Sequence, residues 1–360
     1  MTIKSPLLSR PAAVEASGAD AGVAAHYGEP LREQRALAAG TAVVDLSNRG
    51  VVTVTGPDRL SWLNTLSSQQ LTSLAPGQST ELLLLSVQGR IEFDARVVDD
   101  GATTWLIVEG AEAGPLAEWL NKMKFMLRVE IADVSADWAV LGSTQRIPDW
   151  SALQVWEDPW PHVGAGGYSY AVVGEDAHPG LERPWFEYLV PAAELVQTVG
   201  ERALAGTMAS EALRIAAWRP RWGAETDDKT IPHELDLLRT AVHLAKGCYK
   251  GQETIARVHN LGHPPRRLVF LQLDGSQHTL PASGSEVRAG DRKVGAVTSV
   301  AQHYEMGPVA LAVIKRSVAP DDVLTVVDGD EPYAAAQEVI VAPDAGQVVG
   351  RQTGFLRGPR

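Results

Sequence analysis

The chain has 360 residues, of which 45% are hydrophobic and 21% are charged, and its formal net charge is −12. This length exceeds the number of residues that one hydrophobic core usually supports, so we expect two or three domains. The composition is typical of a folded globular protein. The acidic balance argues against direct binding to nucleic acid or to an acidic membrane, and a single cysteine excludes an internal disulfide, which fits a reducing cytoplasm.

The N-terminal segment, residues 1–27, is rich in Ala, Ser, Gly and Pro, and we expect it to be loose. Glu15 and Asp20 interrupt its alanines, so it lacks the apolar core of an export signal. Nowhere does the chain contain about 18 consecutive uncharged apolar residues, which argues against a transmembrane helix. The sequence therefore predicts a soluble cytoplasmic protein.

Residues 28–135 combine β-branched runs with helical patterns. Gly56 to Asp58 predicts a turn, and Gln88-Gly89 predicts the turn of a β-hairpin. Strands followed by helices are typical of an α+β domain with its helices on one side of the sheet. We predict strands at 41–45, 51–54, 82–87, 91–98 and 101–108, and helices at 31–39, 58–71 and 114–127.

Residues 136–265 begin as a second unit of the same kind, with a flexible stretch at 164–167 and a helix predicted over 189–205. Residues 208–260 are polar and irregular, and a long loop of this kind is more often functional than decorative. From residue 266 to 360, short β runs alternate with Gly and Asp turns, which predicts a small all-β barrel or sandwich.

The stretch K-G-C-Y-K-G-Q-E, residues 246–253, contains the single cysteine. Gly251 opens a predicted helix, so Cys248 lies just before a helix N-terminus, where the helix dipole favours a thiolate. Lys246 and Lys250 add two cations that also lower the pKa of a thiol. A reactive thiolate is one interpretation, and a half-buried cysteine in a glycine turn is the other.

Other chemistries for this thiol are less well supported. A cysteine protease needs a histidine partner, for which His233, His243, His259 and His263 are candidates, but no nucleophile signature surrounds Cys248. An iron–sulfur cluster held by one chain usually takes four thiolates. Gly262 and Pro264 interrupt a helix between His259 and His263, so we expect no zinc site. Phosphate-cradling loop motifs are also absent from the sequence.

The octet at 246–253 resembles the signature of the YgfZ-type folate-binding proteins, which are relatives of the glycine-cleavage T-protein (aminomethyltransferase). The resemblance extends over residues 25–345. It is carried by DLSNRGVVTVTG (45–56), WLN (62–64), QGRIEFD (88–94), Phe186-Glu187, VGAVTS (294–299) and ALAV (310–313).

The resemblance implies three domains arranged as a ring around a central site for tetrahydrofolate or a one-carbon derivative. It implies that Glu187, with Trp185 in place of the family glycine, holds the pterin ring, since a carboxylate accepts hydrogen bonds from a guanidine-like edge. Asp94 corresponds to the second of two aspartates near the catalytic acid, although Phe93 replaces the first. Arg214 matches a T-protein arginine, but the residues after it depart from the family pattern. The resemblance thus implies Glu187, Asp94 and Arg214 as the folate-binding residues.

The family T-protein has no cysteine at the position of Cys248, whereas the YgfZ group does. This implies a tetrahydrofolate-binding accessory protein that supports iron–sulfur cluster assembly or repair, including tRNA-modifying enzymes, with Cys248 as the thiolate and Lys246 lowering its pKa. Its partners would be transient iron–sulfur proteins. The alternatives are a folate-dependent aminomethyltransferase-like enzyme and a folate-binding module with a structural cysteine, so enzymatic activity is left open.

Overall fold

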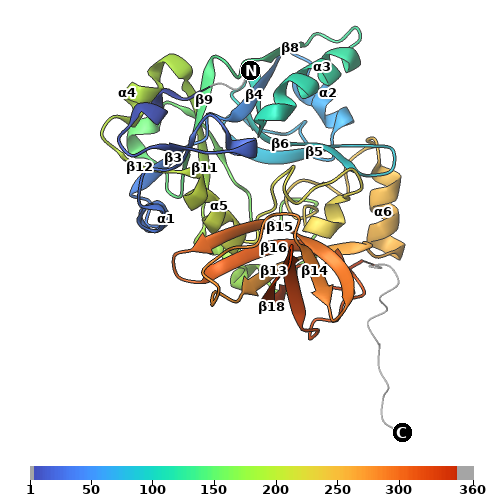
Figure 1. Cartoon of the computed structure of the whole chain (residues 1–360). Helices are drawn as coiled ribbons and strands as arrows, with labels where there is room; N and C mark the ends of the chain where they lie inside the picture. Colours follow the sequence, from blue (N-terminus) through green and yellow to red (C-terminus); the bar gives the residue numbers. More distant parts are fainter. Residues whose placement is uncertain (1–3, 347–360) are drawn as a thin grey trace.

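The computed structural model describes residues 4–346 of the chain. Two five-stranded sheets and a closed six-stranded barrel form the fold, and the barrel lies below both sheets in Figure 1. The predicted fold class, two α+β units followed by a small β-barrel, is confirmed. Each sheet has its own hydrophobic core, and the barrel encloses another.

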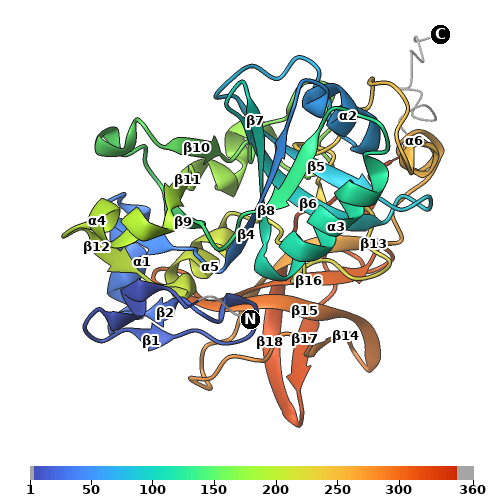
Figure 2. The same cartoon turned by 90° about the horizontal axis from the view of Figure 1, so that it is seen from above.

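The first sheet is antiparallel throughout, and α2 and α3 cover one of its faces, as Figure 2 shows for α3. Leu63 of α2 and Leu116 of α3 pack on the buried strand residues Val52 and Leu84. The hairpin predicted around Gly89 is confirmed as the β5–β6 pair. In spatial order the elements are β5 (Ser79–Leu85), β6 (Ile91–Asp99), β7 (Thr103–Glu109), β4 (Arg49–Thr55) and β8 (Glu130–Asp133), with α2 (Arg59–Leu66), η3 (Gly110–Glu112) and α3 (Ala113–Met123).

The second sheet takes one strand, β3, from the chain before the first sheet, so residues 46–48 cross from one sheet to the other. The helix predicted over 189–205 is wrong, because buried Leu189 and Val190 continue a strand and Gly200 ends a short helix at φ +56°. In spatial order the strands are β10 (Gln154–Glu157), β11 (Phe186–Pro191), β9 (Trp138–Ser143), β3 (Ala42–Asp45) and β12 (Ala203–Ala205), with helices α1 (Pro30–Ala38), α4 (Leu195–Val199) and α5 (Thr207–Ala216).

The N-terminal segment was expected to be loose, but its described part is folded onto the second sheet. Leu7 is buried beside Val43 and Leu195, and Val23 is fully buried. Burial of these apolar side chains stabilises the folded segment, and the overall composition of residues 1–27 did not indicate it. The segment comprises η1 (Pro6–Ser9), β1 (Val14–Glu15), η2 (Gly18–Asp20) and β2 (Ala24–His26).

The barrel is closed, which leaves no sheet edge exposed along it. Alternate residues such as Val269, Ile314 and Val326 fill its interior. Helix α5 contacts both β15 of the barrel and β3 of the second sheet, so it joins two domains. Around the barrel the strands are β13 (Arg266–Leu273), β16 (Gly307–Lys315), β15 (Arg292–His303), β14 (Glu286–Ala289), β17 (Leu324–Asp328) and β18 (Glu331–Val339).

The polar segment between α5 and the barrel runs through the centre of the molecule. Its residues Trp218 and Leu238 share a hydrophobic cluster with Trp160, Phe270 and Ile340, which come from the second unit and the barrel. This segment contains η8 (Pro232–Leu235) and α6 (Gln252–Leu261). Elsewhere short 3₁₀ turns lie at Pro148–Trp150 (η4), Glu175–Ala177 (η5), Pro179–Glu182 (η6) and Ala192–Glu194 (η7).

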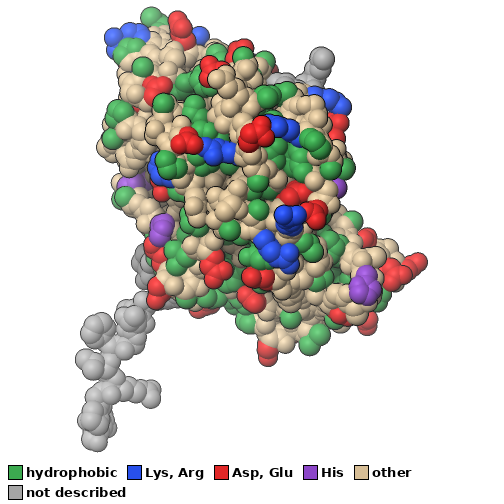
Figure 3. Space-filling model, turned by 90° about the vertical axis from the view of Figure 1, so that its left-hand side faces the viewer, with side chains coloured by type: hydrophobic (Ala, Val, Ile, Leu, Met, Phe, Trp, Pro, Cys, Tyr) green, Lys and Arg blue, Asp and Glu red, His purple; other side chains and the backbone are tan. Residues whose placement is uncertain are grey.

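Charged side chains of both signs are mixed on one face of the molecule. On the face shown in Figure 3, acidic and basic groups lie next to one another rather than in separate patches. Among residues 4–346, the helices are all too short or too polar to cross a lipid bilayer.

Candidate functional site

The centre of the molecule contains a buried network of charged side chains. Side chains alternate along a strand, so Asp94 and Arg96 of β6 project from the same face of the first sheet. The β5–β6 register places Glu81 opposite Arg96, and Asp94 lies two residue pairs further along, on the same face. Glu81, Asp94 and Arg96 therefore form one polar cluster on this face.

Glu81 is held from two sides by the irregular central segment. The Arg219 guanidinium donates to Glu81 Oε1 at 2.6 Å and the Thr240 hydroxyl donates to Oε2 at 2.5 Å. Arg219 also donates to Asp158 at 3.2 Å. Glu81 is 1% exposed, so this ion pair is screened little by solvent.

Asp94 and Glu112 are two carboxyl groups of this centre whose pKa values are raised. Desolvation and the neighbouring Glu81 raise the pKa of Asp94 to about 8, against the opposing effect of Arg219 and Arg96. Desolvation and Asp94 likewise raise the pKa of Glu112 to about 9. A carboxyl group with a pKa near the working pH can both give and accept a proton.

Glu187 lies on β11, 1% exposed, and faces the same centre. Its Oε1 accepts a hydrogen bond from the Trp185 indole N–H at 3.1 Å and lies 3.4 Å from Arg96 Nε. Desolvation acts to raise the pKa of Glu187, but Arg96 and Arg49 outweigh it and lower that pKa. Within the described residues, Glu187 Oε2 has no hydrogen-bond partner.

Glu187 and Arg214 line the same small cavity, of about 20 Å³. This volume holds about one water molecule. Among its lining side chains are five arginines (49, 96, 183, 214 and 219) and three acids (Asp158, Glu187 and Glu211). The structure therefore brings two of the predicted binding residues together in a site rich in guanidinium groups.

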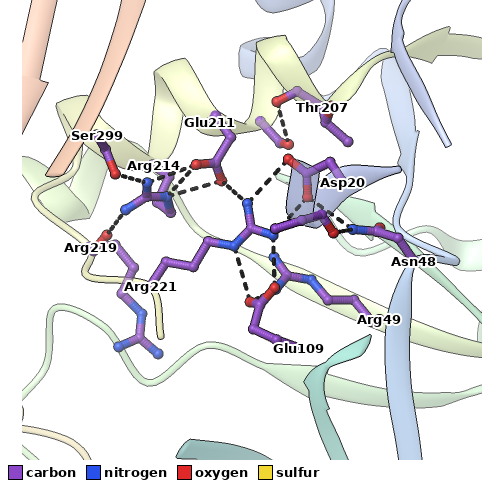
Figure 4. Close-up of polar contacts among 12 residues, drawn as sticks. Asp20, Asn48, Arg49, Glu109, Thr207, Glu211, Arg214, Arg219, Arg221 and Ser299 are labelled. Carbon is purple, nitrogen blue, oxygen red and sulfur yellow. Dashed lines mark hydrogen bonds and ion pairs between the residues drawn. The ribbon is translucent and has the colours of Figure 1, made fainter. Parts of the chain in front are cut away.

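Arg214 is fully engaged within the protein. From α5 it donates to Glu211, to the Ser299 hydroxyl of the barrel and to the Arg219 carbonyl, as Figure 4 shows. It also donates to Glu225. These bonds use all three of its nitrogen atoms. In this arrangement Arg214 fixes α5 to the barrel.

Lys246 is placed away from the cavity, at the end of α2. Its ammonium group donates to the carbonyls of Asn64, Ser67 and Gln69, at 2.5, 2.6 and 2.8 Å. The last four carbonyls of a helix lack partners within the helix, so Lys246 stabilises the C-terminus of α2. Desolvation lowers the pKa of Lys246 to about 8.

Cys248 is exposed and precedes α6, whose start at Gln252 confirms the predicted helix. The residues lining the small cavity do not include Cys248. A hydrogen-bonded path still links its loop to the centre. Gln69, whose carbonyl binds Lys246, donates to the Thr240 carbonyl, and the Thr240 hydroxyl donates to Glu81.

The histidines considered as zinc ligands lie in different surroundings. His259 Nδ1 contacts the Tyr170 hydroxyl at 3.2 Å, whereas His263 Nδ1 contacts the Ala345 carbonyl at 2.7 Å. Within residues 4–346, no group of three or more His, Cys, Asp or Glu side chains is arranged to hold a metal ion.

Several residues of this centre were missed by sequence reasoning, namely Arg49, Glu81, Arg96, Glu112, Asp158 and Arg183. The available signal was the group of three arginines at 214, 219 and 221 within a polar loop, since clustered cations inside a fold require carboxylate partners.

Comparison with known proteins identifies the class. Residues 23–143 match the GCVT N-terminal domain, and residues 266–343 match the glycine cleavage T-protein C-terminal barrel domain. The chain therefore belongs to the T-protein-like family.

Individual relatives carry a consistent name. An aminomethyltransferase of Nostoc sp. is 29% identical over 80% of this chain and 80% of its own length. An aminomethyltransferase of Corynebacterium aurimucosum is 26% identical over 86% of each chain. The crystal structure of aminomethyltransferase T from Bartonella henselae superposes with a TM-score of 0.72, covering 93% of this chain and 94% of that one at 18% identity. That structural likeness supports the fold.

Proposed function

We propose that the protein is a folate-dependent one-carbon transferase of the aminomethyltransferase type, with Asp94 as its acid–base residue. The observation that carries the proposal is the place of Asp94 on β6 in the central charged cluster with Glu81 and Arg219, where desolvation and Glu81 raise the pKa of Asp94 to about 8. The relatives named aminomethyltransferase support the same reaction class.

The residues present suit tetrahydrofolate in their chemistry. Glu187 Oε2 is a buried acceptor without a partner, and a pterin ring offers amino and ring N–H donors to such an oxygen. The cavity beside it holds only about 20 Å³, so a ring can enter only if a lining side chain such as Trp185 moves. When bound, tetrahydrofolate supplies the nitrogen atoms that accept the one-carbon unit.

The protein's own contribution is to hold a ligand and to move one proton. Glu187 orients a ligand through its free oxygen, and the Asp94 carboxyl gives a proton to the leaving amine or takes one from the acceptor. Glu81 raises the pKa of Asp94 and Arg219 lowers it. Proton transfer by a positioned carboxyl contributes a rate factor of about 10² to 10⁴.

The test is an assay in which purified protein converts an aminomethyl donor and tetrahydrofolate to methylene-tetrahydrofolate. Asp94→Asn should lower kcat by about 10² to 10⁴-fold, because the amide cannot transfer the proton. Glu92→Gln is the matched control, since Glu92 lies on the same strand but pairs with Lys250 and is about one-third exposed. No turnover by the wild type, or full activity of Asp94→Asn, would refute the proposal.

The iron–sulfur accessory role of the YgfZ group is a second candidate. It is favoured by the exposed thiol of Cys248, in the loop that leads into α6, which a partner protein can reach. Tetrahydrofolate would then act beside a transient iron–sulfur protein. Cys248→Ser should fail to restore iron–sulfur enzyme activity in cells that lack the native protein, and full restoration would exclude this role.

A further inference from the structure

A second and larger pocket lies where the chain passes between the two sheets. Its volume is about 560 Å³, within the range of small-molecule sites. Gly18, Ala19 and Ala21 of the N-terminal segment form one wall, and Ser47, Asn48 and Arg49, at the crossing from β3 to β4, form another. These walls consist mostly of small side chains, which leave space for a ligand.

Two buried polar groups of this pocket have no hydrogen-bond partner within residues 4–346. Arg49 is 6% exposed, and its Nε–H is unpaired, although another of its nitrogens contacts Glu109. Asn48 Oδ1 is an unpaired acceptor. Burial and the neighbouring Arg221 lower the pKa of the Arg49 guanidinium, so an anion in the pocket would stabilise its charge. Buried polar atoms are seldom left unpaired, which points to a ligand or water here.

An internal carboxylate, that of Asp20, lies behind the N-terminal wall of the pocket and contacts Asn48 of the lining. Asp20 accepts hydrogen bonds from Arg221 at 2.7 and 3.2 Å and from the Asn48 amide at 2.9 Å. Figure 4 shows the Arg221 guanidinium between Asp20 and Glu109. Asp20 belongs to the N-terminal segment, and its bond to Arg221 joins residues that are 201 positions apart in the sequence.

The remaining charged residue of the lining is Asp133, whose Oδ1 accepts from Ser135. One arginine and one aspartate therefore face the pocket, together with a free N–H donor and a free oxygen acceptor. This pattern is complementary to a small molecule with a negative and a positive end.

We propose that this pocket binds a small zwitterion of the α-amino-acid type, whose carboxylate contacts Arg49 and takes the place of Asp20 on the Asn48 amide, and whose ammonium group contacts Asn48 Oδ1 and Asp133. Asp20 acts as an internal competitor that occupies the carboxylate position until the ligand enters. The inference depends on this pocket alone and not on folate-dependent transfer, so either proposal can fail without the other.

The experiment measures binding of L-alanine by saturation-transfer NMR on its methyl group. Asp20→Asn should bind L-alanine about tenfold more tightly than the wild type, because it removes the charge that competes for the site. Asp291→Asn, the same change at an exposed barrel residue, should bind as the wild type does. L-Alaninamide, which lacks the carboxylate, and propionate, which lacks the ammonium group, should each bind at least about tenfold more weakly.

A second measurement uses the wild type, so it does not depend on a variant that folds. If L-alanine displaces Asp20, amide hydrogen exchange of residues 16–22 should become faster when L-alanine is added. Equal affinity of Asp20→Asn and wild type, binding of L-alaninamide as tight as that of L-alanine, or unchanged exchange over residues 16–22 would each overturn the proposal.

Discussion

Arg219 is the residue whose removal best tests the central network. Arg219→Met keeps most of the side-chain volume but removes the guanidinium that pairs with Glu81 at 2.6 Å and Asp158 at 3.2 Å. Arg219 is 5% exposed, so both carboxylates are left buried without this cation. Breaking one buried ion pair costs about 3 to 5 kcal/mol, which is a large part of the stability of a typical domain.

The assay is urea unfolding followed by tryptophan fluorescence, compared with Arg146→Met. Arg146 pairs with Glu157 on the surface, where both side chains are more than half exposed, so its loss should cost less than about 1 kcal/mol. Adding Glu81→Gln to Arg219→Met should recover part of the loss, because one uncompensated charge disappears.

The pH dependence gives this prediction a second check. Desolvation raises the pKa of Asp158 and Arg219 opposes that effect, so Arg219→Met should raise the pKa further. A carboxyl whose pKa is higher in the folded than in the unfolded state loses stability as the pH rises. The deficit of Arg219→Met should therefore shrink at acidic pH. A deficit below about 1 kcal/mol at pH 7, or equal to that of Arg146→Met, would refute the reasoning.

Three further predictions concern the cavity, the lysine and the protonated carboxyls. Trp185→Gly should enlarge the cavity beside Glu187 and tighten tetrahydrofolate binding measured by calorimetry, and weaker binding would contradict the placement of the pterin. Lys246→Met should lower the free energy of unfolding by about 1 to 3 kcal/mol, because three carbonyls at the end of α2 lose their donor, and an unchanged urea midpoint would exclude this role. Asp94 and Glu112 have folded-state pKa values of about 8 and about 9, so they bind protons more tightly when folded and stability should fall from pH 5 to about 9. The double variant Asp94→Asn, Glu112→Gln should show a smaller fall in its urea midpoint, and an identical fall would contradict the assignment.

The hairpin, the barrel and the helix after Cys248 could be predicted because their signals are local. A turn at Gly89 between two β-rich runs specifies β5 and β6 through neighbouring residues alone. The same holds for Gly251, whose φ of +85° precedes α6. The helix predicted over 189–205 failed because tertiary packing overrode local pattern. Leu189 and Val190 gain more by burial between strands β9 and β10 than by forming a helix turn.

The candidate site was predicted in part. Sequence resemblance selected Asp94, Glu187 and Arg214, and the structure places all three in the central charged network. It places Lys246 at the end of α2 instead, and Cys248 on the surface. The family positions identify which residues face the centre, but they do not specify which cation pairs with which acid.

The sequence by itself determined the order of the domains, the strand and turn pattern of the barrel, and the position of the thiol before a helix, because each depends on residues a few positions apart. Only the tertiary structure decided the pairings of Arg219 with Glu81, 138 residues away, and of Arg221 with Asp20, 201 residues away. A charge can be buried only when its partner is buried with it, so the chemistry of this centre follows from contacts that no local pattern encodes.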